Sequence, residues 1–186
     1  MRELFQSFEC ENVAYLLIGG QATVIYGAAD FTQDVDIWIR PDLQNFDRLL
    51  RSLAACRARV HKLTPPLTLH WARRGHGFHF IVPTRESRVP LDVLARPPRV
   101  GSFAAAKKRA RLEDTDWGRL PLVAEEDLVL RRQGQPQGYW LNTKKASRPR
   151  QKTLPLPIAN CGPPGAFGSK VRPLRISSEE SDLGHG

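Results

Sequence analysis

The chain has 186 residues, 41% of them hydrophobic, which is enough for one globular core of ordinary size but not for two. No apolar run approaches the roughly 20 residues of a membrane-spanning helix, and the first residues lack the apolar core of a secretory signal. The net charge is +9, but residues 1–130 hold 18 Lys and Arg against 16 Asp and Glu, whereas residues 131–186 hold 10 against 3. These features exclude a membrane-spanning protein, predict a cytoplasmic one, and place most of the basicity in the tail.

The first third of the chain alternates between predicted helices and buried strands. Apolar residues at positions 4, 5 and 8 predict a short amphipathic helix, and the apolar run at 13–18 predicts a buried strand that ends at Gly19 and Gly20. A helix over 21–26 should follow, with Gly27 as its C-terminal cap. Residues 34–39 predict the next strand, and Pro41 and Asp42 should open a helix that carries its apolar residues at spacings of three and four up to Leu53.

The middle of the chain predicts short strands over residues 67–71, 78–82 and 89–94, the last two as a hairpin. Ser102 should cap a helix that reaches Arg109, residues 120–123 predict a last strand, and residues 125–130 start a helix that the sequence does not finish. The pattern predicts one α/β domain over residues 1–130, with a mixed sheet and flanking helices.

Residues 131–186 are rich in Pro, Gly, Lys, Arg and Ser. Such a composition buries too little apolar surface to offset the entropy lost on ordering, so we expect a disordered basic tail. The abrupt change after Leu130 leaves open that the domain is incomplete at its C-terminus, or that the reading frame shifts there. The charge of the tail is either solvated and nonspecific or makes contact with RNA or an acidic partner.

Three carboxylates carry most of the chemical information. Asp34 and Asp36 would lie on one face of their strand, because side chains alternate along a strand. Two like charges on one face are costly unless a cation lies between them, and hard divalent cations are held by carboxylate oxygens together with substrate phosphates. Asp92, on a later strand, would complete a site for one or two Mg²⁺ (or Mn²⁺) ions and could activate an acceptor hydroxyl. The backbone at Gly19 and Gly20 could approach a triphosphate closely.

With these motifs, the chain resembles the nucleotidyltransferase superfamily related to DNA polymerase beta. It is most similar to small prokaryotic members such as the AbiEii-type toxins and the minimal nucleotidyltransferases. The resemblance rests on residues 17–22, 26–27, 32–37 and 91–93. It implies metal-dependent transfer of a nucleoside monophosphate from a nucleoside triphosphate such as ATP to an RNA, protein or small-molecule acceptor, with pyrophosphate released. It also implies a toxin that modifies tRNA or a protein, a cognate antitoxin as partner, and nucleotide contacts from Gly19, Gly20, Gln21 and Thr32.

Two departures from the family pattern keep an alternative open. Asp30 stands where family members often carry an arginine, and the chain changes composition where they usually continue into further helices. The alternative is a degenerate, catalytically inactive domain that binds a nucleotide or a partner.

Other interpretations of single motifs are weaker. Glycosyltransferases also use an Asp-x-Asp pair, but usually need a longer chain and lack the early glycine turn. His70, His76 and His79 lack the compact spacing of a zinc site, and packing or phosphate contact is favoured for them. Arg73 and Arg74 fit contact with a triphosphate or RNA as well as they fit an exposed hairpin end. Trp38 is expected to pack at the core or rim.

Overall fold

The computed structural model describes residues 1–98 and 100–132, and all of them belong to one compact unit. The tail expected over residues 131–186 lies outside this part of the chain, except that Arg131 and Arg132 end the last helix. The helices are α1 (Arg2–Cys10), α2 (Gly19–Ile25), α3 (Leu43–Ala55), α4 (Leu69–Arg73), α5 (Phe103–Arg109) and α6 (Glu125–Arg132). The strands are β1 (Tyr15–Ile18), β2 (Val35–Ile39), β3 (Arg59–Val60), β4 (Gly77–Pro83), β5 (Arg88–Leu94), β6 (Arg111–Thr115) and β7 (Gly118–Leu122). Within the described residues, no helix is long and apolar enough to cross a membrane.

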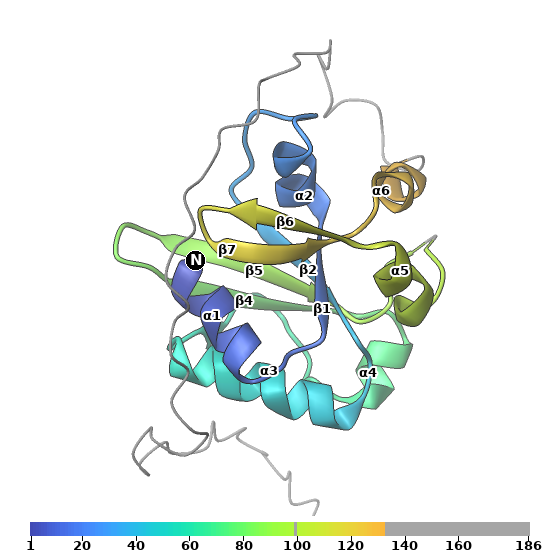
Figure 1. Ribbon diagram of the computed structural model, residues 1–186. Coiled ribbons are helices and arrows are strands. Elements are labelled where there is room, and N and C mark those ends of the chain that lie inside the picture. Colours follow the sequence, from blue (N-terminus) through green and yellow to red (C-terminus); the bar gives the residue numbers. More distant parts are fainter. Residues whose placement is uncertain (99, 133–186) are drawn as a thin grey trace, which may run out of the picture. The chain divides into compact units, whose positions relative to one another are not determined.

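The strands form one seven-stranded mixed sheet in the order β3-β4-β5-β2-β1-β7-β6, with helices flanking it (Figure 1). β2 runs parallel to β5, and β1 runs parallel to β7. The other neighbouring strands are antiparallel, including the predicted hairpin of β4 and β5. The predicted fold class, an α/β domain with a mixed sheet and flanking helices, is therefore confirmed.

One face of the sheet is apolar and packs against α1 and α3. Val35, Ile37 and Ile39 alternate along β2 and are completely buried. The Phe5 ring of α1 stacks on Tyr15 of β1 at a centroid distance of 5.8 Å. α1 and α3 lie next to each other (Figure 1), so the core sits between these two helices and the sheet. Asp36 lies on the opposite face of β2.

The predicted caps explain where several helices begin and end. The carboxylate of Asp42 accepts a hydrogen bond of 2.9 Å from the Asn45 N–H at the start of α3. The Ser102 hydroxyl accepts one of 3.2 Å from the Ala105 N–H at the start of α5. Gly27 follows α2 with a φ of +73°, a conformation that glycine adopts without strain. α2 itself begins at Gly19, two residues earlier than predicted.

Three short elements differ from the prediction. Residues 67–71 do not form a strand, because residues 69–73 form α4. Over so short a segment, apolar residues two and four apart fit either one helical turn or a strand, and the strand was the wrong choice. The edge strands β3 and β6 were not predicted. Both are largely exposed, so neither carries the apolar alternation that marks a half-buried strand.

Candidate functional site

Asp36 and Asp92 lie opposite each other on neighbouring strands. In the parallel pair of β2 and β5, Asp36 is the register partner of Asp92. Neighbouring strands are about 4.8 Å apart, and residues opposite each other project from the same face of a sheet. Both carboxylates are half-buried, whereas Val35 and Ile37 on either side of Asp36 are buried in the core. The fold thus brings together two acidic residues that are 56 positions apart in the chain.

Gly19 lies directly against the Asp36 carboxylate. Ile18, the residue before it, is the register partner of Asp36 in the antiparallel pair of β1 and β2. A Cβ atom added at Gly19 would lie 1.9 Å from Asp36 Oδ2, and the φ of Gly19 is +69°. Only glycine therefore fits between the end of β1 and this carboxylate.

The remaining residues expected to contact the nucleotide gather beside Gly19. A Cβ atom added at Gly20 would lie 2.6 Å from Thr32 Oγ1. The Gln21 side-chain amide donates a hydrogen bond of 3.3 Å to the Thr32 carbonyl. Gly19, Gly20, Gln21 and Thr32 thus form one continuous wall next to Asp36, built from the first turn of α2 and the segment before β2.

Asp34 occupies a different environment from the other two aspartates. It lies just before β2, outside the strand, and is exposed. Among the described residues, no three or more His, Cys, Asp or Glu side chains gather closely enough to hold a metal ion. The donor set nevertheless suits a hard cation, since Asp36 and Asp92 offer oxygen ligands from one face and Mg²⁺ is commonly held by one or two carboxylates plus substrate phosphates.

His79 contacts the Asp92 carboxylate. The two residues are opposite each other in the antiparallel pair of β4 and β5, and His79 Nδ1 lies 2.7 Å from Asp92 Oδ1. Hydrogen bonds with Thr64 and His61 fix the backbone of His79. Its N–H donates to Thr64 Oγ1 (3.1 Å), and its carbonyl accepts from the His61 N–H (2.8 Å).

The pairing of His79 with Asp92 was missed at the sequence level. The signal was present in the predicted hairpin, because a tight connection between strands near residues 78–82 and 89–94 makes residue 79 face residue 92. The two other histidines are placed elsewhere. The rings of His70 and His76 pack edge-on against Trp71, at centroid distances of 5.0 and 4.7 Å.

Trp38, which follows Asp36 on the same face of β2, is a packing residue. Its side chain is 2% exposed, and its ring meets Phe103 of α5 edge-on. The indole Nε1 donates a hydrogen bond of 3.2 Å to the Ala95 carbonyl. The expectation of core or rim packing is confirmed, and α5 closes this end of the aspartate-bearing face.

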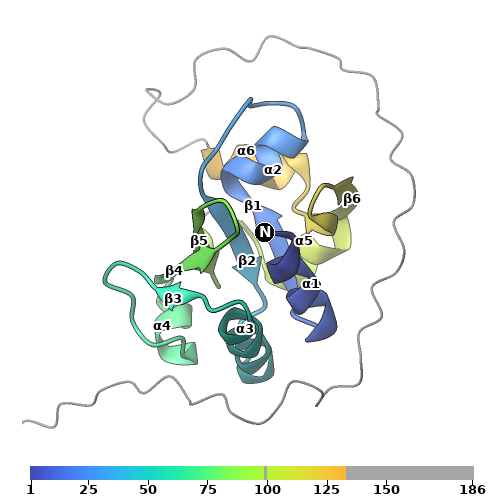
Figure 2. The same ribbon diagram turned by 90° about the vertical axis from the view of Figure 1, so that its left-hand side faces the viewer.

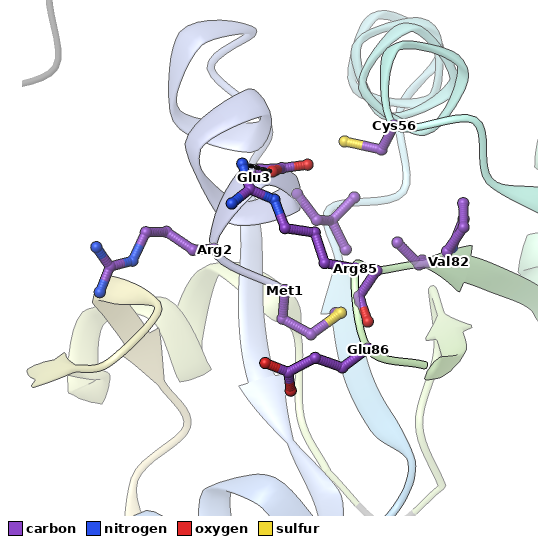
Figure 3. Close-up of a pocket in the computed structure, with 10 residues that line it drawn as sticks. Met1, Arg2, Glu3, Cys56, Val82, Arg85 and Glu86 are labelled. Carbon is purple, nitrogen blue, oxygen red and sulfur yellow. Dashed lines mark ion pairs between the residues drawn. The ribbon is translucent and has the colours of Figure 1, made fainter. Parts of the chain in front are cut away.

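A hollow of about 460 Å³ lies elsewhere on the domain (Figure 3). It is lined by the start of α1, the end of β4 and the turn after it, and Cys56 at the end of α3. Arg85 and Glu3 form an ion pair of 4.0 Å across it. None of the predicted site residues lines this hollow, so the aspartates are not part of it.

No family model and no curated protein matches the chain. Two solved structures are similar to it. A Thermotoga maritima protein assigned as a nucleotidyltransferase is 12% identical, with a TM-score of 0.45 over 69% of this chain and 77% of that chain. ANT(2″)-Ia, in complex with adenylyl-2″-tobramycin, is 12% identical, with a TM-score of 0.47 over 68% of each chain. At this identity and TM-score, neither similarity assigns a function to the chain.

Proposed function

We propose that the domain is a metal-dependent nucleotidyltransferase whose site is formed by Asp34, Asp36 and Asp92. The observation that carries the proposal is the register pairing of Asp36 with Asp92, with the backbone of Gly19 packed against the Asp36 carboxylate. Two carboxylates held on one face repel each other. If neither had a function, replacing one of them would therefore cost the domain no stability. A bound divalent ion, Mg²⁺ or Mn²⁺, would relieve this repulsion and stabilise the charge that develops on the phosphates.

In this proposal, the residues divide the work. Asp36 and the exposed Asp34 would hold the metal ion, which would bind the phosphates, and Gly19, Gly20, Gln21 and Thr32 would contact the nucleotide from the side. Asp92 takes the proton of the acceptor hydroxyl. The acceptor oxygen forms a bond to the α-phosphorus, while the bond from the α-phosphorus to the bridging oxygen breaks and pyrophosphate leaves. No further reactant is needed.

The hydrogen bond to His79 supports a role for Asp92 as the proton acceptor. This hydrogen bond engages Oδ1 and fixes the plane of the carboxylate, so that Oδ2 can accept the proton of the acceptor hydroxyl. Because His79 lies on β4 and Asp36 on β2, the two partners lie on opposite sides of β5. Asp92 can therefore be oriented by one neighbouring strand while it serves a site shared with the other.

The activity is tested by incubating the full chain with each α-labelled nucleoside triphosphate, Mg²⁺, and total cell RNA, total protein or small-molecule hydroxyl acceptors. We expect label to enter one acceptor class. Asp36→Asn and Asp92→Asn should each lower the transfer rate on the order of 100-fold or more. Asp47→Asn is the matched control, because Asp47 is an exposed aspartate on α3 and its replacement makes the same change in charge. Transfer that survives both site variants would refute the assignment.

The finer proposal is a toxin that transfers a nucleotide to tRNA or to a protein and is neutralised by a cognate antitoxin. The family resemblance of the motifs motivates it. Induced expression of the wild-type chain should then arrest growth, and expression of Asp36→Asn should not. Arrest by both chains alike would speak against a transferase toxin.

An inactive nucleotide-binding domain is the second candidate. Two observations favour it: one oxygen of Asp92 is already engaged by His79, and the described residues contain no group of three metal-ligating side chains. Such a domain would bind a nonhydrolysable triphosphate but transfer nothing to any acceptor. Turnover by the wild-type chain excludes this candidate.

A further inference from the structure

The folded domain separates its charges along the chain. Residues 48–85 contain eight Arg and Lys residues and four His residues, but no Asp or Glu. Residues 1–47 and 86–130 together contain ten Arg and Lys against sixteen Asp and Glu. The formal charge of residues 1–130 is therefore nearly balanced only in total: residues 48–85 carry +8, and the other residues of this range carry −6. Clustered charge of one sign indicates a surface that meets a partner of the opposite sign.

The fold collects this basic segment at one edge of the sheet. The segment contains most of α3, together with β3, α4 and β4, and β3 and β4 are the two outermost strands on that side. Figures 1 and 2 both show α3 and α4 near the bottom of the domain. The opposite edge of the sheet is β6, which carries Arg111 together with Glu113 and Asp114, so its charges are mixed. The edge formed by β3 and β4 therefore differs from it in having cations without acidic residues in the same segment.

Most cations of the segment are available to a partner. Arg51 and Arg85 are paired with Glu11 and Glu3. Five others are exposed and form no ion pair within the described part of the chain, namely Arg57, Arg59, Lys62, Arg73 and Arg74. We call these five residues, together with Trp71, the basic edge.

An aromatic ring lies among these cations. Trp71 of α4 is only partly buried, and the Arg74 guanidinium lies 5.8 Å from the centre of its ring. The rings of His70 and His76 make T-shaped contacts with the Trp71 ring, and the part of the ring that is not buried is available to a ligand. Surfaces that bind single-stranded nucleic acid commonly combine cations, which contact the phosphate backbone, with an aromatic ring on which a base can stack.

We propose that the basic edge binds single-stranded RNA. The cations would contact successive phosphates, and an unstacked base would pack on Trp71. The ring favours a single strand over a duplex, whose bases are stacked on each other, and over an acidic peptide, which has no ring of its own to stack. Binding at this edge requires no nucleotide transfer, so the inference goes beyond the proposed function and can fail independently of it. β3, which carries Arg59, pairs with β4, which carries His79, so RNA bound at the basic edge would lie beside the strand whose histidine contacts Asp92.

The first test compares two triple variants of the full chain that change the charge equally. The basic-edge variant is Arg59→Glu, Arg73→Glu, Arg74→Glu. The control is Lys107→Glu, Lys108→Glu, Arg119→Glu, at exposed cations of α5 and β7. The tail, with 10 Lys and Arg against 3 Asp and Glu, is present in both, so its contribution cancels.

Binding is measured by fluorescence anisotropy with a labelled, unstructured RNA 12-mer over a series of salt concentrations. We expect the basic-edge variant to bind at least roughly tenfold more weakly, with the slope of log K against log salt reduced by about 2. The control should change affinity less than about threefold. Far-UV circular dichroism and thermal unfolding verify that both variants are folded. Equal weakening in both variants would overturn the proposal.

The second test addresses the ring and the type of partner. Trp71→Ala should weaken binding of the 12-mer roughly tenfold, whereas Trp71→Phe, which keeps a ring, should weaken it much less. A duplex of the same sequence and a poly-glutamate of matched charge should both bind more weakly than the single strand. Equal binding of the duplex, or of poly-glutamate, contradicts the proposal, as does a Trp71→Ala variant with unchanged affinity.

Discussion

His79 Nδ1 lies 2.7 Å from Asp92 Oδ1 across the antiparallel pair of β4 and β5. Asp92 faces Asp36 on its other side, in the parallel pair of β5 and β2. Asp92 is therefore flanked on one side by a ring that can orient it and on the other by Asp36, which would hold the metal ion. This arrangement determines which substitutions separate binding from turnover.

Replacing His79 should impair turnover more than binding. In His79→Ala, Asp92 loses the hydrogen bond that fixes its orientation, so we expect kcat to fall roughly tenfold or more with KM for the triphosphate nearly unchanged. His79→Asn should restore part of the rate, because its amide nitrogen reaches approximately the position of Nδ1. His79→Gln, which extends toward the position of Nε2, should not. Steady-state kinetics of the three variants test this, and an unchanged kcat in His79→Ala would rule out the positioning role.

Gly19→Ala should destabilise the domain more than Gly27→Ala does. Both glycines have a positive φ, +69° and +73°, so both substitutions cost about 1–2 kcal/mol of backbone strain. A Cβ atom at Gly19 would in addition lie 1.9 Å from Asp36 Oδ2, whereas one at Gly27 meets nothing within 4 Å. Urea unfolding of the two variants isolates the contact with Asp36. Equal free energies of unfolding would mean that Gly19 does not touch the carboxylate in solution.

The Asp42 cap predicts a pH-dependent contribution to stability. Burial acts to raise the pKa of the Asp42 carboxyl, but hydrogen bonds from Arg40 and from the Asn45 N–H outweigh it, and the net pKa is lowered. The contribution is thus present above the unfolded-state pKa and is lost as the pH falls through the folded-state pKa. Asp42→Ala should cost about 1 kcal/mol at pH 7 and less at pH 2, while Asp42→Asn should retain most of the cap. A pH-independent difference in unfolding free energy between the wild type and Asp42→Ala would contradict this account.

The ion pair between Arg109 and Asp127 should be important for holding α6 on the domain. Arg109 Nη2 lies 2.9 and 2.8 Å from the two Asp127 carboxylate oxygens, and the Asp127 side chain is 6% exposed. Arg109→Ala would leave this buried carboxylate unpaired, at a cost of about 1–3 kcal/mol. The comparison is Arg111→Ala, because Arg111 and Glu125 are both exposed and their pair should contribute well under about 1 kcal/mol. Thermal unfolding of the two variants distinguishes these contributions, and similar melting temperatures would show that the buried pair is not special.

The fold was predictable where burial imposes a period. The apolar residues of α3 recur every three or four positions, and Phe46, Leu49 and Leu53 are indeed buried. The caps of α3 and α5 follow from residue type, because the side chains of Asp42 and Ser102 accept hydrogen bonds from free helix N–H groups. β3 and β6 could not be found in this way. Their register is set by main-chain pairing with β4 and β7, and their side chains are mostly solvated.

The candidate site, too, could be predicted from the sequence only in part. That Asp36 and Asp92 would share a face was expected, and their register pairing agrees with it. The contact of Asp36 with Gly19 depends on how β1 and β2 are aligned, which local patterns do not encode, whereas the contact of Asp92 with His79 follows from the register of the predicted hairpin of β4 and β5. The basic edge was hidden for a related reason. The charge of residues 1–130 is nearly balanced in total, and only the fold shows that residues 48–85 gather at one side of the sheet.

The most direct test of the central claim, a metal-dependent triphosphate site at Asp34 and Asp36 beside Asp92, is calorimetric titration of the full chain with a nonhydrolysable nucleoside triphosphate. The wild type should bind in Mg²⁺ and lose binding in EDTA, because the carboxylates and the phosphates need the shared cation. Asp36→Ala should abolish Mg²⁺-dependent binding, whereas Asp92→Asn should largely retain it, and Asp47→Asn should bind like the wild type. Absence of binding by the wild type, or binding that is unaffected by EDTA and by Asp36→Ala, would contradict the claim.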